Sequence, residues 1–157
     1  MKTPKKDVPL SKYSTMRLGG PAKHLLEITD ASEIPEALSW AESQTCKVIM
    51  IGQGSNIVWT DAGFDGLVLV NKIKGLEIQD QEFQSFAVIG AGEVWDEVVE
   101  SIVEKNLSGV EQLSLIPGTA GATPVQNVGA YGQDLSNVMV CVQAYDKETK
   151  QMTVIPK

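Results

Sequence analysis

A short apolar run that ends in a glycine loop restricts the fold of this 157-residue chain more than any other feature. Residues 48–51 read as a compact buried strand, and the sequence then continues G-Q-G-S-N over residues 52–56. Both glycines can adopt positive φ and leave backbone N–H groups pointing outward, and Ser55 and Asn56 add side-chain donors. This pattern suits a diphosphate bound by neutral donors, and a Cβ at Gly54 would then block its approach. The alternative is a plain turn in which Asn56 tolerates left-handed backbone.

Two common nucleotide-binding motifs do not fit the chain. The dinucleotide fingerprint G-x-G-x-x-G needs its third glycine where Ile57 stands, and a second pair, Gly90 and Gly92, fails in the same way at Trp95. The third glycine permits close packing of helix and strand, so both failures matter. The sequence also contains no G-x-x-x-x-G-K-[ST] run. These observations argue against a Rossmann NAD site and a P-loop.

The residues before the loop predict a β-α-β unit that follows an extended lead-in over residues 1–22. His24–Ile28 is the first strand, and the polar residues after it offer helix N-caps. Apolar residues then recur at helical spacing up to the strand at 48–51: Ile34, Leu38 and Ala41. Units of this kind usually make parallel strands.

The second half of the chain mixes short strands with one helix. The apolar face of that helix is formed by Val94, Val98 and Ile102, with Val99 and Val103 beside them. The strands are expected at residues 66–70, 76–78, 86–89, 138–145 and 152–155. The boundary between two lobes is expected near Asn71–Gly75. We therefore predict a first α/β lobe over residues 1–71, which carries the loop, and a second α+β lobe over residues 72–157.

Composition excludes several classes of protein. The chain is 43% hydrophobic and carries a net charge of -7, which allows a real core and argues against a nucleic-acid surface. No apolar run approaches the ~18 residues that span a membrane, and no signal peptide is evident. The sequence thus favours a cytoplasmic protein. Cys46 and Cys141 are expected to be buried thiols in a reducing compartment, with a disulfide as the less favoured alternative and no metal-ligand spacing near either.

A second glycine-rich stretch, PGTAGATPVQNVGAYG, occupies residues 117–132. We expect Val125, Val128 and Tyr131 to pack inward, which leaves the glycines free to let backbone approach a flat ligand. The side chains available for hydrogen bonds are those of Thr119, Thr123, Gln126 and Asn127. The alternative is an irregular structural loop, although long irregular loops in compact domains are more often functional. For Asn127 the two alternatives are an amide that faces the ligand, which we favour, and an amide that bonds the loop's own backbone.

Three further groups of residues have a structural and a functional interpretation. His24 is expected to be structural or on the surface, because no partner stands at a catalytic spacing. Glu93, Asp96 and Glu97 are either acid–base groups or, more simply, complements to a helix dipole. Arg17 is expected to be an ordinary surface arginine, with contact to a ligand phosphate as the alternative.

Four stretches together resemble the UDP-N-acetylenolpyruvoylglucosamine reductase family: IGQGSNIVWTD, NKIKGLEI, GAGEVWDEVV and LIPGTAGATPVQNVGAYG. The resemblance starts near STMRLGGPA and covers essentially the whole chain. It implies an α+β, two-lobed FAD-binding fold of the vanillyl-alcohol-oxidase type, here truncated, with FAD as the cofactor. Ala122 stands where relatives often carry glycine or serine, with Thr123 as a substitute donor. The cofactor-binding residues that it implies are Gly52, Gln53, Gly54, Ser55, Asn56, Ile57, Pro117, Gly118, Gly121, Ala122, Thr123, Gln126, Asn127, Gly129 and Tyr131.

The resemblance also implies a function. The family is an NADPH-dependent flavoprotein oxidoreductase of peptidoglycan synthesis, and so of cell wall biogenesis, cell shape and cell division. It reduces UDP-N-acetylglucosamine enolpyruvate, a nucleotide sugar, to UDP-N-acetylmuramate. Family members run to roughly twice this length, and their catalytic arginine, proton-donating acid and glutamate would follow Lys157. We therefore expect no catalytic residue in this chain and no activity from it alone. The alternatives are a non-catalytic flavin or nucleotide-binding module and another FAD-dependent oxidase of the same fold.

Overall fold

The computed structural model describes residues 2–157 and places them in two compact units. The first unit runs to Lys74, and the second runs from Gly75 to Lys157. The first holds a four-stranded sheet and helix α1 (Glu33–Ser43). The second holds helix α2 (Trp95–Glu104) and three two-stranded sheets. The mixture of helices and strands is that of the expected α+β class.

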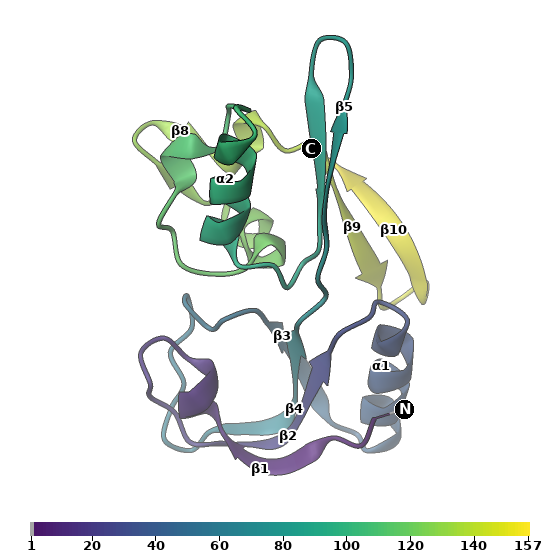
Figure 1. Cartoon of the computed structure of the whole chain (residues 1–157). Coiled ribbons are helices and arrows are strands. Elements are labelled where there is room, and N and C mark those ends of the chain that lie inside the picture. Colours follow the sequence, from purple (N-terminus) through teal and green to yellow (C-terminus); the bar gives the residue numbers. More distant parts are fainter. Residues whose placement is uncertain (1) are drawn as a thin grey trace. The chain divides into compact units, whose positions relative to one another are not determined.

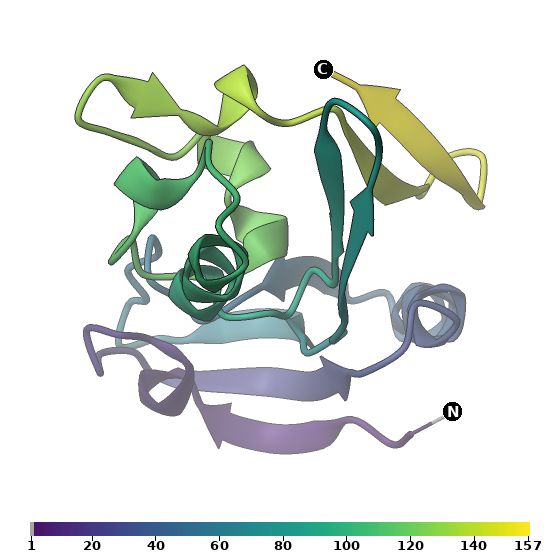
Figure 2. The ribbon, with the colours of Figure 1, turned by 45° about the horizontal axis from the view of Figure 1, so that its top comes forward.

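The sheet of the first unit has the strand order β1-β2-β4-β3. Its strands are β1 (Lys5–Pro9), β2 (Pro21–Ile28), β3 (Lys47–Ile51) and β4 (Phe64–Asn71). β2 and β3 both pair with β4 in parallel, as the predicted β-α-β unit requires. β1 runs antiparallel beside β2 at the edge (Figure 2). The lead-in was expected to be extended only, and β1 was missed because its mostly exposed K-K-D-V-P sequence has no strand periodicity.

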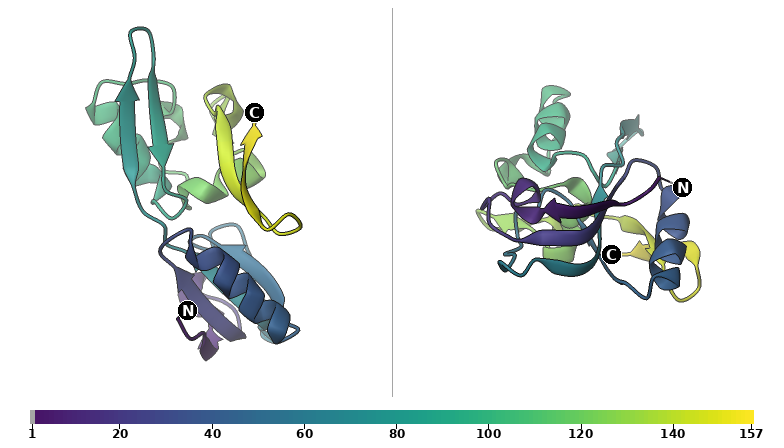
Figure 3. Two further views of the ribbon diagram at one scale, coloured as in Figure 1. Left: turned by 90° about the vertical axis from the view of Figure 1, so that its right-hand side faces the viewer. Right: turned by 90° about the horizontal axis from the view of Figure 1, so that it is seen from below.

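Alternation along the central strand β4 gives the sheet two buried faces. Leu67 and Leu69 pack with Ala37 and Ala41 of α1, which lies along that face (Figure 3). The intervening Val68 and Val70 pack on the opposite side with a second cluster that includes Leu10, Leu25, Ile51 and Trp59. Because side chains alternate across a strand, a buried run of four apolar residues supplies both clusters.

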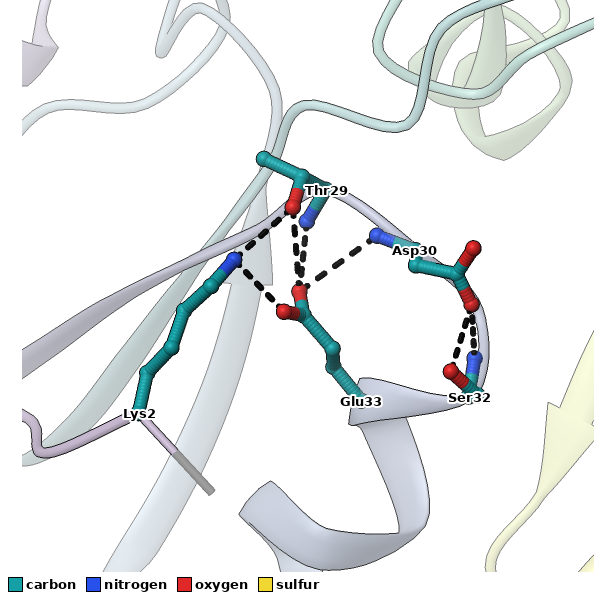
Figure 4. Close-up of polar contacts among 5 residues, drawn as sticks. All are labelled: Lys2, Thr29, Asp30, Ser32 and Glu33. Carbon is teal, nitrogen blue, oxygen red and sulfur yellow. Dashed lines mark hydrogen bonds and ion pairs between the residues drawn. The ribbon is translucent and has the colours of Figure 1, made fainter.

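Helix α1 begins at Glu33, whose carboxylate binds backbone N–H groups of the preceding turn in place of a Ser or Thr cap. The Glu33 carboxylate accepts the backbone N–H groups of Thr29 at 2.8 Å and Asp30 at 3.3 Å, and it pairs with Lys2 Nζ at 2.5 Å (Figure 4). Asp30 Oδ1 in turn accepts the backbone N–H and the hydroxyl of Ser32. These contacts satisfy N–H groups of the turn that precedes the helix and fix its conformation.

The second unit is organised by the buried face of α2. Trp95 is 2% exposed, and its indole N–H donates to the carbonyl oxygen of Leu113 at 2.9 Å. Val98, Val99 and Ile102 complete the face as predicted, whereas Val103, also expected on it, is 45% exposed. The rest of the unit consists of 3₁₀ turns and the paired strands β5 (Leu76–Asp80) with β6 (Ser85–Ile89), β7 (Gly129–Ala130) with β8 (Gln133–Asp134), and β9 (Cys141–Asp146) with β10 (Gln151–Pro156).

The β5–β6 and β9–β10 hairpins stand out as separate ribbons of the second unit (Figure 1). The strand expected to start at Val138 starts at Cys141 instead, because Val138 N–H bonds back to Leu135 and closes the 3₁₀ turn η5 (Leu135–Asn137).

The expectation of two buried thiols was also wrong. Cys141 is exposed on β9 and Cys46 is half-buried, and both are free cysteines.

Within residues 2–157, no helix has the length and apolar character needed to cross a membrane. Among the same residues, no group of three or more His, Cys, Asp or Glu side chains is arranged to hold a metal ion.

The contacts of Glu33 predict an acid-dependent contribution to stability. Its pKa is lowered from 4.5 to about 2, first by the hydrogen bond from Lys2 and then by the Thr29 N–H. Since the folded pKa lies below the unfolded value, this stabilisation is present above pH 4.5 and is lost as the pH falls through about 2. An NMR pH titration should find Glu33 ionising near 2, and Glu33→Gln should weaken the acid dependence of unfolding. Lys2→Gln should move the Glu33 pKa back toward its ordinary value, and no movement would contradict the assignment.

Candidate functional site

The glycine loop joins β3 to β4 and follows the carboxyl end of a parallel strand. In open sheets of parallel strands, ligands bind outside these carboxyl ends. Gly54 is buried in this loop and has φ 68, a left-handed conformation that suits glycine. A Cβ at Gly54 would lie 2.1 Å from the carbonyl oxygen of Tyr13. Gly54 is therefore required for packing against the lead-in segment, whereas the sequence suggested a direct approach to a ligand.

The loop retains backbone donors that have no acceptor among the residues the structure describes. Among the hydrogen bonds of residues 2–157, none has the backbone N–H of Gln53 or Gly54 as its donor. The Gly54 carbonyl instead accepts the backbone N–H of Thr15 at 3.3 Å, which attaches the loop to the lead-in segment. The side chains or backbone of Ser55 and Asn56 already take part in interactions within the chain. The two unused N–H groups are thus the loop's clearest means of binding an anion.

The first unit holds two buried donors without partners among residues 2–157, one beside this loop and one three positions after it in the sequence. The hydroxyl of Ser14 and the indole N–H of Trp59 are both buried, and neither meets a hydrogen-bond partner in residues 2–157. Ser14 lies directly beside Gly54, since its Cα is 3.2 Å from the position of a Gly54 Cβ. Buried donors without partners are uncommon and call for an explanation. A neighbourhood that lacks acceptors in this way fits an oxygen-rich group such as a diphosphate.

The second glycine stretch is held by its own backbone against the start of α2. Trp95 N–H donates to the Gly118 carbonyl at 3.0 Å, and Gly121 N–H donates to the Ala91 carbonyl at 2.9 Å. A Cβ at Gly121 would lie 2.5 Å from the Cβ of Ala91, so this glycine is needed for close packing. The N–H of Ala120 is likewise bonded to the Glu93 carbonyl at 2.9 Å. The four successive backbone N–H groups of residues 120–123 are therefore occupied, unlike those of Gln53 and Gly54.

Two of the polar side chains proposed for ligand contact instead bond to backbone groups, one within the stretch and one shortly after it. The buried Thr123 hydroxyl donates to the Ala120 carbonyl at 2.7 Å, so its proton is not available to replace a donor missing at Ala122. Asn127 Oδ1 accepts the backbone N–H of Ser136 at 3.0 Å. Asn127 also has φ 43, which asparagine tolerates better than most residues. The structure thus favours the structural alternative for the Asn127 amide over the ligand contact expected from the sequence.

Apolar side chains project from this stretch where inward packing was expected. Val128 is buried at 6% exposure, as predicted, but Val125 is 87% exposed and Tyr131 is 90% exposed. Tyr131 adopts φ 52, and Leu115, 82% exposed, adopts φ 62. Non-glycine residues held at positive φ with exposed apolar side chains are uncommon and are found at functional sites. The stretch can therefore meet a flat apolar ligand with its surface while its amides hold the fold.

The acidic residues near α2 are explained by their contacts. Asp96 Oδ1 accepts the Leu115 N–H at 2.6 Å and the Ser114 hydroxyl at 2.8 Å, and these bonds lower the Asp96 pKa. Glu93 Oε1 accepts the Gly75 N–H at 2.6 Å. Both carboxylates anchor backbone segments, so the interpretation as a paired acid and base is not needed.

The structure distributes the predicted site residues between the two units. Residues 52–57 lie in the first unit, and the residues from Pro117 to Tyr131 lie in the second. Sequence reasoning did not include Tyr13 and Ser14, which shape the first loop. The sequence indicated only that they lie in the lead-in, because no local pattern links them to a loop some 40 residues later.

The family model described as "FAD binding domain" matches residues 22–153. A curated UDP-N-acetylenolpyruvoylglucosamine reductase of Streptomyces avermitilis is 42% identical over 150 residues, which are 96% of this chain and 40% of the relative. The protein of the same name from Escherichia coli is 33% identical over 149 residues, 94% of this chain and 43% of the relative. The chain thus spans less than half the length of these two relatives. The resemblance stated from the sequence motifs is confirmed.

A solved structure supports the fold. The crystal structure of UDP-N-acetylenolpyruvylglucosamine reductase from Thermus caldophilus superposes with a TM-score of 0.77 at 22% identity, and the match covers 98% of this chain and 53% of that chain. At this identity the likeness establishes the fold, and the expected α+β FAD-binding fold is confirmed.

The contact at Gly54 predicts that adding a single methyl group there strongly lowers the free energy of unfolding. Gly54→Ala must accommodate both a left-handed φ and a clash with the Tyr13 carbonyl. Gly132→Ala is the matched control, because Gly132 has φ 83 but nothing within 4 Å of its Cβ position. We expect Gly54→Ala to lose about 1–3 kcal/mol more of unfolding free energy than the control, as overpacking does. Equal losses in urea titrations would mean that the Tyr13 contact does not constrain the loop.

The hydrogen bond from the Ser136 N–H predicts that Asn127 stabilises the folded chain. Asn127→Ala should lower the free energy of unfolding without ligand by about 1 kcal/mol or somewhat more, because both the bond and the φ preference are lost. Asn127→Gly loses the same amide but keeps the left-handed backbone, so it separates the two contributions. Urea unfolding measures both variants. Unchanged stability together with an altered spectrum of bound flavin would restore the ligand contact.

Proposed function

We propose that this chain, which belongs to the FAD binding domain family, is the flavin-binding part of a UDP-N-acetylenolpyruvoylglucosamine reductase. The observation that carries this proposal is the loop after β3, where the backbone N–H groups of Gln53 and Gly54 have no acceptor among residues 2–157 and the buried, unpartnered Ser14 hydroxyl lies beside Gly54. Such an array fits the diphosphate of a dinucleotide cofactor. The names and lengths of the relatives support the assignment to this reductase.

We assign the two glycine stretches different parts of FAD. Residues 52–57 would hold the diphosphate through backbone donors, which need no positive side chain in the loop. Residues from Pro117 to Tyr131 would lie along the flavin, with exposed side chains in contact and internal bonds fixing the backbone. FAD, when bound, supplies the hydride chemistry, and the protein contributes position and electrostatics. The residues predicted from the sequence thus remain our proposed site, with Asn127 and Thr123 in supporting roles.

In the longer protein we propose reduction of UDP-N-acetylglucosamine enolpyruvate with NADPH as co-substrate, in the cytoplasm and for peptidoglycan synthesis. The catalytic arginine, acid and glutamate of that reaction would lie outside residues 1–157, as would the lobe that binds the nucleotide sugar. This chain would then provide the cofactor and no catalytic side chain. The division of labour follows from the resemblance and from the share of the relatives that the chain covers.

This proposal predicts binding without turnover. The purified 157-residue chain should bind added FAD and retain the visible absorption of oxidised flavin through gel filtration. It should not oxidise NADPH when UDP-N-acetylglucosamine enolpyruvate is added, because the side chains that act on that substrate are elsewhere. Free FAD at the same concentration is the control for background oxidation.

The two measurements have separate meanings. A folded chain that binds no FAD at high micromolar concentration would contradict the flavin assignment. NADPH oxidation that depends on the substrate would contradict the placement of the catalytic residues. A longer protein that holds FAD but reduces no substrate would favour the alternative of a non-catalytic flavin-binding module.

A further inference from the structure

Arg17 is the only arginine in the sequence, and the structure gives its backbone an unusual conformation. It stands at φ 55 in the turn that follows Tyr13, with its N–H bonded to the Ser14 carbonyl at 3.0 Å. The left-handed region is unfavourable for a residue with a long side chain. Arg17 is exposed, between Met16 and Leu18, which are also exposed.

This turn is attached to the glycine loop by two neighbouring contacts. The backbone N–H of Thr15 donates to the Gly54 carbonyl at 3.3 Å, and the Tyr13 carbonyl occupies the space where a Gly54 Cβ would lie. Arg17 is therefore two residues from a direct bond to the loop. Because the turn closes on Ser14, Arg17 is held at the loop rather than carried away along the chain.

Arg17 also differs from the paired basic side chains of the first unit. Lys2 pairs with Glu33 at 2.5 Å and Lys23 pairs with Asp65 at 2.8 Å. The guanidinium of Arg17 makes no ion pair or hydrogen bond among residues 2–157. A planar guanidinium suits the bidentate binding of phosphate oxygens. In a chain of net charge -7, an anion at this loop would gain from one nearby cation.

We propose that Arg17 is a further diphosphate-binding residue, whose guanidinium supplies the positive charge that the glycine loop itself lacks. The loop N–H groups of Gln53 and Gly54 would hold the phosphate oxygens from the protein side, and Arg17 would cover them from the turn. The buried Ser14 hydroxyl, in the same turn and without a partner, is a further donor in this neighbourhood. This inference rests on the proposed function, because the diphosphate is that of FAD.

The test compares the binding of FAD to the wild-type chain and to Arg17→Gln, with Lys12→Gln as the matched control. Lys12 is exposed in the short 3₁₀ helix η1 (Leu10–Tyr13), and its replacement removes the same charge five positions earlier. Arg17→Gln should weaken FAD binding at least tenfold, the usual scale for a charged hydrogen bond. It should also reduce the salt dependence of FAD binding, while Lys12→Gln changes affinity less than threefold.

A third variant guards against a folding defect. Arg17→Gly fits the left-handed backbone, so it should melt without ligand at the same temperature as the wild type or higher, and yet bind FAD as weakly as Arg17→Gln. If both Arg17 variants bind FAD as the wild type does, or no more weakly than Lys12→Gln, Arg17 has no part in the site. A wild-type chain that binds no FAD would instead contradict the proposed function.

Discussion

The contact between Gly54 and the carbonyl oxygen of Tyr13 is the constraint on which the first loop depends. Only a residue without a Cβ can occupy this position, where the Cβ would lie 2.1 Å from that oxygen. The lead-in is itself fixed, because Leu10 is fully buried and its N–H bonds to the Gly20 carbonyl at 3.0 Å. A loop pressed against a fixed segment keeps its conformation without a ligand. Preorganisation of this kind lowers the entropy lost on binding.

The two glycine-rich stretches look alike in sequence and differ in structure. At Gln53 and Gly54 the backbone N–H groups have no acceptor in the described chain, whereas those of Ala120 and Gly121 bond to the segment before α2. Glycine has a packing role in both places, since a Cβ would clash at Gly54 and at Gly121. A loop that can bind a ligand therefore differs from a packed loop in whether its backbone N–H groups already have acceptors, and not in its glycine content.

The electrostatics of the chain are consistent with an anionic ligand despite its negative charge. Asp96 and Glu93 bond to backbone N–H groups, so these carboxylates are committed to holding the fold. Glu33 has the same task at α1, where it accepts two backbone N–H groups and pairs with Lys2. Carboxylates placed in this way contribute through short-range bonds, and screening limits their effect at a distance. Backbone donors can then bind phosphate locally.

The sequence by itself determined the parallel β-α-β unit, the apolar face of α2 and the existence of two glycine stretches. Each of these is a local pattern: a short apolar run marks the strand at residues 48–51, helical spacing marks Val98 and Ile102, and motif order carried the family resemblance. Tertiary structure decided the rest. Val125 and Tyr131 point outward, Asn127 bonds to Ser136, and Tyr13 shapes the loop at Gly54. These facts depend on contacts between residues that are distant in sequence or on which side of an irregular loop faces the core, and no periodic pattern encodes either.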